Sequence, residues 1–77
     1  MFPANDVLEL LDDEPFEPFR IELATGRKFL IERPENLIVM SNKCYFFQFE
    51  GRIAKTVQHL SLANVVRMEP VNGARPR

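Results

Sequence analysis

Apolar and polar residues alternate on both sides of a glycine in the first half of the chain, a pattern typical of a β-hairpin. The alternation covers residues 19–23 and resumes over residues 28–32. Between them lie residues 24–26, where Gly26 can adopt the positive φ that closes a three-residue loop. Pro34 cannot donate a ladder hydrogen bond, so it ends the second strand. We therefore predict a hairpin around which the rest of the chain is arranged.

Four further strands are predicted over residues 37–40, 44–49, 53–60 and 65–69. Short consecutive strands joined by tight turns are typical of an antiparallel meander. The strand at 44–49 is apolar on both faces, whereas a sheet with one face in water needs only alternation. We expect its second face to be covered by a helix, by curvature of the sheet or by another subunit.

The segment before the hairpin predicts a short helix that Asn5 or Asp6 can cap. Val7, Leu8 and Leu11 share one face of this helix. Because about nine residues are too few for a stable isolated helix, it must lie against the body of the protein.

These elements predict a mainly β fold with one N-terminal helix, of the α+β class. The strands would form a small, strongly bent antiparallel barrel of five to six strands. Residues 1–69 form a single helix-plus-barrel domain, and residues 70–77 are predicted to be a disordered tail. The predicted core consists of Leu8, Leu11, Phe19, Ile21, Leu23, Phe29, Ile31, Val39, Phe46 and Val65.

Composition limits the chemistry that the chain can carry. The only cysteine is Cys44 and the only histidine is His59, so we predict no intrachain disulfide, no metal site and no cofactor. A lone cysteine suits a reducing compartment, which predicts a cytoplasmic protein. No signal peptide and no apolar run of membrane-spanning length is found, so no membrane partner is expected.

Charge is distributed unevenly along the chain. The net charge is −1, which argues against general nucleic-acid binding. Residues 1–19 contain six acidic residues and no Lys or Arg, whereas the remainder contains all ten Lys and Arg and five acidic residues. An acidic arm therefore precedes a basic body, and the two parts partly neutralise each other.

No arrangement of residues typical of catalysis is found. The chain lacks a glycine-rich phosphate loop, a CxxC motif and an HExxH motif. No Ser or Cys nucleophile can be placed beside His59 from the sequence, and Cys44 opens an apolar strand in which a structural thiol is expected. We predict that the protein is not an enzyme.

A possible interaction surface follows the fourth strand, where aromatic and basic residues are interleaved. Binders of single-stranded nucleic acids stack bases on aromatic rings beside a basic groove. The alternative, which we favour, is that the rings are buried. The candidate residues are Lys43, Tyr45, Phe47, Phe49, Arg52, Lys55 and His59.

Two resemblances are carried by these motifs. The Pro-Phe-x-Pro-Phe entry at residues 15–19, the Gly26 hairpin and the Pro-Glu at residues 34–35 resemble a family of small uncharacterised bacterial proteins. That resemblance implies no activity. The order of a short helix, a glycine hairpin and further short strands resembles the Sm-like fold of the Hfq type, and SH3-like barrels are similar.

The resemblance to the Sm-like fold implies ring-forming proteins that bind RNA through a Lys-His pair before the last strand and a Gln ahead of the helix. Here His59 follows Gln58 rather than a lysine, and no Gln precedes the helix. The architecture is therefore carried over, and the RNA-binding residues are not.

The predicted function is protein–protein interaction or self-assembly, with Sm-like RNA binding as the alternative. The strands at 53–60 and 65–69 would be sheet edges, and they contain few of the charges or prolines that protect natural edges. We expect a homo-oligomer, a dimer or a ring, formed by pairing of strand edges. A further protein partner is left open, and RNA is possible but not favoured.

Overall fold

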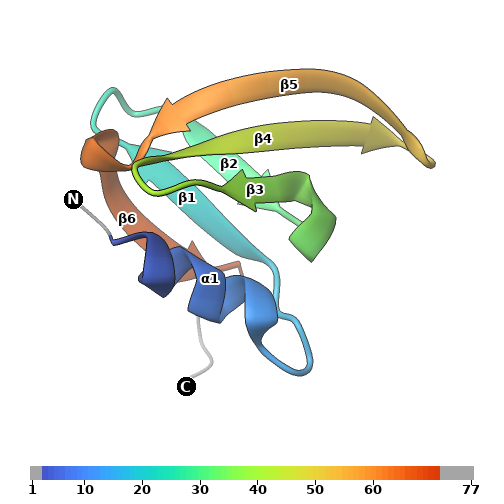
Figure 1. Cartoon of the computed structure of the whole chain (residues 1–77), viewed down its shortest axis with the longest axis horizontal. Helices are drawn as coiled ribbons and strands as arrows, with labels where there is room; N and C mark the ends of the chain where they lie inside the picture. Colours follow the sequence, from blue (N-terminus) through green and yellow to red (C-terminus); the bar gives the residue numbers. More distant parts are fainter. Residues whose placement is uncertain (1–2, 72–77) are drawn as a thin grey trace.

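The structure, a computed structural model, describes residues 3–71 and shows two three-stranded antiparallel sheets with one N-terminal helix (Figure 1). The helix is α1 (Ala4–Asp12). The strands are β1 (Phe19–Leu23), β2 (Lys28–Ile31), β3 (Leu37–Val39), β4 (Lys43–Glu50), β5 (Ile53–Ser61) and β6 (Val65–Pro70), with short 3-10 helices η1 (Pro34–Asn36) and η2 (Leu62–Asn64). The predicted mainly β fold with one helix is confirmed.

The first sheet is built on the predicted hairpin. The N–H of Leu23 donates to the carbonyl of Arg27 and the N–H of Gly26 donates to the carbonyl of Leu23, which encloses a three-residue loop. Gly26 has a φ of 92°, so the prediction that it occupies the left-handed region is confirmed. Phe19, Ile21 and Leu23 are buried, as their alternation predicts.

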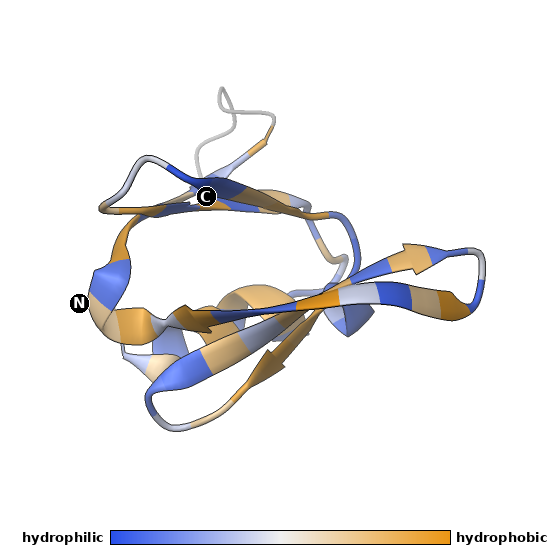
Figure 2. Cartoon of the chain, turned by 90° about the horizontal axis from the view of Figure 1, so that it is seen from above, coloured by the Kyte–Doolittle hydropathy of each residue, from blue (hydrophilic) through white to orange (hydrophobic). Residues whose placement is uncertain are grey.

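The second sheet has the order β3-β4-β5. A bulge between Gln48 and Phe49 shifts the register of the β4–β5 pair, and bulges bend a strand and increase its twist. Beyond this bulge the β4–β5 hairpin projects past the two layers of the molecule (Figure 2). Five residues in a row, 53–57, are exposed on β5, so the projecting part of this strand has little contact with the body.

The predicted meander is wrong at two connections. Strand β6 pairs with β1 and not with β5, because η2 turns the chain from one sheet to the other. Residues 62–64, between the predicted strands at 53–60 and 65–69, form this 3-10 helix. Strands β2 and β3 are not paired either, since η1 separates them. Two sheets result, β2-β1-β6 and β3-β4-β5, in place of one continuous ladder.

The core lies between the two sheets and is completed by α1. Its buried apolar residues are Val7, Phe19, Ile21, Leu23, Phe29, Ile31, Leu37, Cys44, Phe46, Leu60, Leu62 and Val65. Ala4, Leu10 and Leu11 lie partly buried against this cluster. None of the helices among residues 3–71 is long and apolar enough to cross a membrane.

Three details of the predicted helix and core are wrong. Leu8 is 40% exposed, because it lies about 100° around the helix from the buried Val7. Leu11 and Val39 are only partly buried. Neither Asn5 nor Asp6 caps α1: the N-cap is Pro3, whose carbonyl accepts from the N–H of Asp6.

The C-terminal boundary differs slightly from the prediction. Strand β6 includes Pro70, which pairs with Phe19, and the N–H of Val71 donates to the carbonyl of Pro18. The rest of the predicted disordered tail, residues 72–77, lies outside the described residues.

Replacing Gly26 with valine should destabilise the fold by more than about 1 kcal/mol, because a β-branched side chain is a steric outlier at positive φ. Chemical denaturation would measure the change, with Thr25→Val as the control, since Thr25 has no positive φ. Equal midpoints for the two variants would show that the loop does not depend on the conformation of Gly26.

Candidate functional site

The outer faces of the two sheets differ in chemistry. On β2-β1-β6 the charges are paired across strands. The Nη1 of Arg20 lies 3.6 Å from Oε1 of Glu69, and the Nε of Arg67 lies 3.8 Å from Oε1 of Glu22. The register also places Lys28 opposite Glu22. Alternating opposite charges across neighbouring strands are typical of a solvated face. Its exposed large apolar residues are Leu30, which lies opposite Arg20, and Val66, which lies at the register shift between β1 and β6.

The outer face of β3-β4-β5 is instead aromatic and aliphatic. One row across the three strands joins Ile38, Tyr45 and His59, and the next joins Phe47 and Val57. We refer to these five residues as the aromatic face. Ile38 is 53% exposed and Val57 is 56% exposed. An apolar set that crosses three strands differs from the single exposed apolar residues that are normal on protein surfaces.

The rings on this face contact one another and a lysine. The centroid of the Tyr45 ring lies 5.7 Å from that of His59, and the Nζ of Lys43 lies 5.9 Å from the centre of the same Tyr45 ring. The rings of Phe47 and Phe49 stack with their centroids 6.5 Å apart. Tyr45, Phe47 and Phe49 are half-buried, so the favoured prediction that these rings are buried is met only in part. The neighbouring Phe46 points to the other side of β4 and supplies the core.

The seven candidate residues fall into two groups. The first group is brought together on or beside the aromatic face and consists of Lys43, Tyr45, Phe47, Phe49 and His59. Arg52 and Lys55 lie instead on the projecting end of the β4–β5 hairpin. There Arg52 is exposed in the turn, and the Nζ of Lys55 lies 3.3 Å from a carboxylate oxygen of Glu50.

Strand β5 also presents a long free edge. It pairs with β4 on one side, and no described strand pairs with the other side over its nine residues. Lys55 is the only Lys, Arg, Asp or Glu on this strand, and proline is absent from it. An unprotected edge of this length is a template for pairing with another strand.

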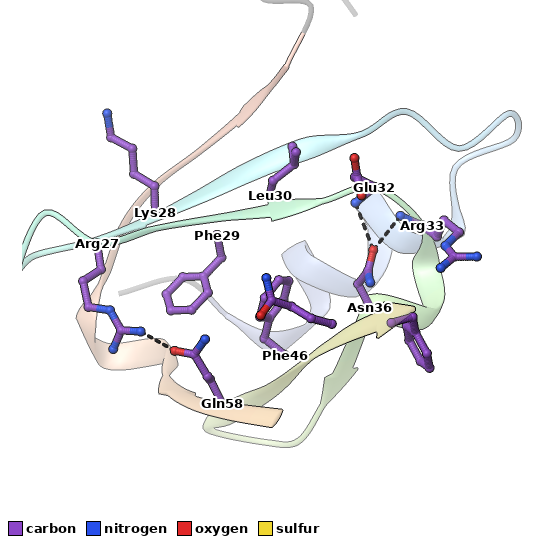
Figure 3. Close-up of a pocket in the computed structure, with 11 residues that line it drawn as sticks. Arg27, Lys28, Phe29, Leu30, Glu32, Arg33, Asn36, Phe46 and Gln58 are labelled. Atoms are coloured by element: carbon purple, nitrogen blue, oxygen red, sulfur yellow. Dashed lines mark hydrogen bonds between the residues drawn. The ribbon is translucent and has the colours of Figure 1, made fainter. Parts of the chain in front are cut away.

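A groove of about 400 Å³ lies between β2 and the β4–β5 hairpin, which contributes Phe46, Gln48, Phe49 and Gln58 to its lining (Figure 3). We refer to it as the β2 groove. Its floor contains Phe29 and Phe46, whose ring centroids are 5.2 Å apart. At one end the guanidinium of Arg27 donates to the amide oxygen of Gln58.

The other end of the β2 groove is closed by the side chain of Asn36. Its Oδ1 accepts from the N–H groups of Glu32 and Arg33 at 3.0 and 2.9 Å, and its Nδ2 donates to the carbonyl of Phe47 at 2.9 Å. Asn36 is 6% exposed and is the one buried polar residue among those described. One amide therefore links the end of β2 to β4, where β3 has not yet begun.

Sequence reasoning missed the residues that other strands contribute to these surfaces. Ile38 and Val57 were assigned to strands, but their exposure depends on which face of the sheet meets water. Arg27, Arg33 and Asn36 stand in or beside turns, where they resemble ordinary solvated residues. The pairing register of the strands places Ile38 and Val57 on the aromatic face, and the gap between the sheets places Arg27, Arg33 and Asn36 along the β2 groove.

Among residues 3–71 no group of three His, Cys, Asp or Glu side chains gathers closely enough to hold a metal ion. His59 contacts a tyrosine ring, while the hydroxyl of Ser61 accepts from the N–H of Ala63. Cys44 is fully buried, and burial raises the pKa of its thiol from 9.0 to about 11.

Cys44 should therefore be unreactive in the folded protein. A raised pKa lowers the thiolate fraction at a given pH, to about one in a thousand at pH 8, and the thiolate is the nucleophile. An aromatic disulfide reagent should label the protein only after guanidinium chloride is added, when one thiol per chain reacts. Complete labelling within seconds without denaturant would contradict the burial of Cys44.

Comparison with known proteins gives no relative from which a site could be transferred. No protein-family model, no curated protein and no solved structure matches this chain.

Proposed function

We propose that this chain is a non-enzymatic interaction domain that self-assembles through the aromatic face and the free edge of β5. The observation that carries the proposal is the contrast between the two sheets. One sheet has cross-strand ion pairs on its outer face, with Leu30 as a single exposed apolar residue beside them. The other sheet exposes Ile38 and Val57 beside half-buried rings. A cytoplasmic location, suited to the lone thiol, is part of this proposal.

The free edge of β5 is where a strand of a second copy would pair in the proposed contact. A strand added to β5 would extend the β3-β4-β5 sheet and pair backbone groups that are otherwise left to water. Two arrangements are compatible with it. In a two-fold dimer β5 pairs with β5 of a second copy, and in a head-to-tail ring it pairs with β6, the other late edge strand.

The same proposal includes a relationship to small barrels of the Sm-like or SH3-like kind. It is supported by the order of the elements: β5 leads through a 3-10 helix to β6, and β6 returns to pair with β1. In this interpretation β2 and β3 correspond to one long bent strand of the barrel, which η1 interrupts. The barrel is then not closed, because no ladder joins β2 to β3.

Sm-like RNA binding is a second candidate, favoured by two contacts of Tyr45: Lys43 precedes it by two residues on β4, and His59 lies opposite it on β5. Stacking of a base on an aromatic ring beside a cation is the usual mode for single strands. Binding of a labelled oligouridine that is lost in Tyr45→Ala, while Tyr45→Phe keeps it, would favour this candidate over self-assembly.

Val57→Glu should convert the assembly into a monomer, because a carboxylate at the centre of the contact would be buried without a partner. Sedimentation velocity at micromolar concentration would measure the mass, against the 9.0 kDa of one chain. Leu8→Glu is the control, since Leu8 is also an exposed apolar residue but lies on α1.

A third variant separates the two arrangements. Val66 is 54% exposed on β6, so Val66→Glu should disrupt a head-to-tail ring and leave a β5–β5 dimer intact. A wild-type protein that stays monomeric at every concentration would refute self-assembly. The same conclusion would follow if Val57→Glu had the mass of the wild-type assembly.

A further inference from the structure

We propose that the β2 groove binds an extended acidic peptide of a partner protein, which adds as a strand to the open edge of β2. None of the five residues of the aromatic face lines this groove, although Phe49, which stacks on Phe47, lies between the two surfaces. The proposal therefore goes beyond self-assembly and does not depend on it.

The backbone of β2 supplies the first argument. Leu23 and Arg27 form a hydrogen-bonded pair, so in the register of this hairpin the pairs Ile21–Phe29 and Phe19–Ile31 are hydrogen-bonded as well. The N–H and C=O groups of the intervening Lys28 and Leu30 therefore point away from β1. No strand among the described residues pairs with that edge. Two donors and two acceptors are thus available along the β2 groove.

Charge supplies the second argument. Arg27, Lys28 and Arg33 line the β2 groove, and Glu32 is the one acidic residue that lines it. Neither guanidinium belongs to an ion pair with a described carboxylate. The Cζ of Arg27 lies 5.0 Å from the centre of the Phe29 ring, and the Cζ of Arg33 lies 5.6 Å from the centre of the Phe49 ring. Two guanidinium groups held against rings and lacking an anion are suited to bind carboxylates.

The placement of these groups sets the form of the ligand. Asn36 already binds the N–H groups of Glu32 and Arg33, so only the edge at Lys28 and Leu30 is open to a strand. A peptide of about seven residues would span from Arg27 to Arg33 at roughly 3.3 Å per residue. Acidic residues are then expected at both ends and uncharged residues between them.

A peptide fits these features better than a nucleic acid does. Phe29 is 4% exposed and Phe46 is 5% exposed, so neither offers a face on which a base could stack. A nucleic acid also lacks the alternating donors and acceptors that would pair with a strand edge. The C-terminal residues of this chain, GARPR, are basic and are a poor match for the cations of the groove.

Fluorescence anisotropy of the full chain with a labelled peptide would test the proposal. The probe has glutamate at both ends and alternating valine and threonine between them, about seven residues in all. Arg27→Glu and Arg33→Glu should each weaken its binding about tenfold or more, since each loses a charge-assisted contact. Arg67→Glu is the charge-matched control, because Arg67 lies on β6 at the opposite edge of the same sheet and does not line the groove, and it should change the affinity less than about twofold.

Two modified probes separate strand addition from attraction of charge alone. A peptide with N-methyl groups on the residues that face β2 should lose binding, because it cannot donate to the ladder, and a peptide with lysine in place of glutamate should not bind. Equal binding of the N-methylated peptide would overturn strand addition. No detectable binding of the acidic probe, or tighter binding of an oligouridine that Arg27→Glu abolishes, would overturn the acidic-peptide assignment.

Discussion

The arrangement of this protein depends on how the chain crosses from one sheet to the other between β2 and β3. No backbone ladder joins the two strands there, and the side chain of Asn36 provides three hydrogen bonds in its place. A buried amide is costly unless its donors and acceptors are paired, and here no buried side-chain polar atom among the described residues lacks a partner. The link is therefore specific as well as stabilising, because only a side chain with both a donor and an acceptor can form it.

The two candidate surfaces follow from this break in the ladder. Because η1 interrupts the strand, β2 retains an open edge and the gap beside it becomes the β2 groove, with Asn36 at its end. Because β3 has only three residues, the distal part of β4 pairs with β5 alone and the hairpin projects from the body. No described element covers the centre of the aromatic face, since Ile38 and Val57 are both more than half exposed. One connection thus accounts both for the cationic groove beside β2 and for the exposed apolar face of the β3-β4-β5 sheet.

The sequence predicted the features that depend on local pattern, such as strand positions and the conformation of Gly26. It did not predict strand pairing or burial, which depend on residues far apart in the chain. Alternation located the six strands to within about two residues, and the conformation of Gly26 followed from its place in the loop. The partner of β6 was not predictable, because nothing in residues 65–70 specifies pairing with β1 rather than β5. Leu8 was placed in the core because neighbouring apolar residues on a helix look equivalent until one side meets the sheets. Asn36 looked like a turn residue, and its role depends on the distant carbonyl of Phe47.

The most direct test of this account is the free energy of unfolding of Asn36→Ala, measured by chemical denaturation. The account predicts a loss of about 3 kcal/mol, since three hydrogen bonds disappear at roughly 1 kcal/mol each and the backbone groups they satisfied lie near the core. Asn64→Ala removes the same side chain at an exposed position, and should cost less than about 0.5 kcal/mol. Equal stability of the two variants would contradict the claim that Asn36 holds the two sheets together.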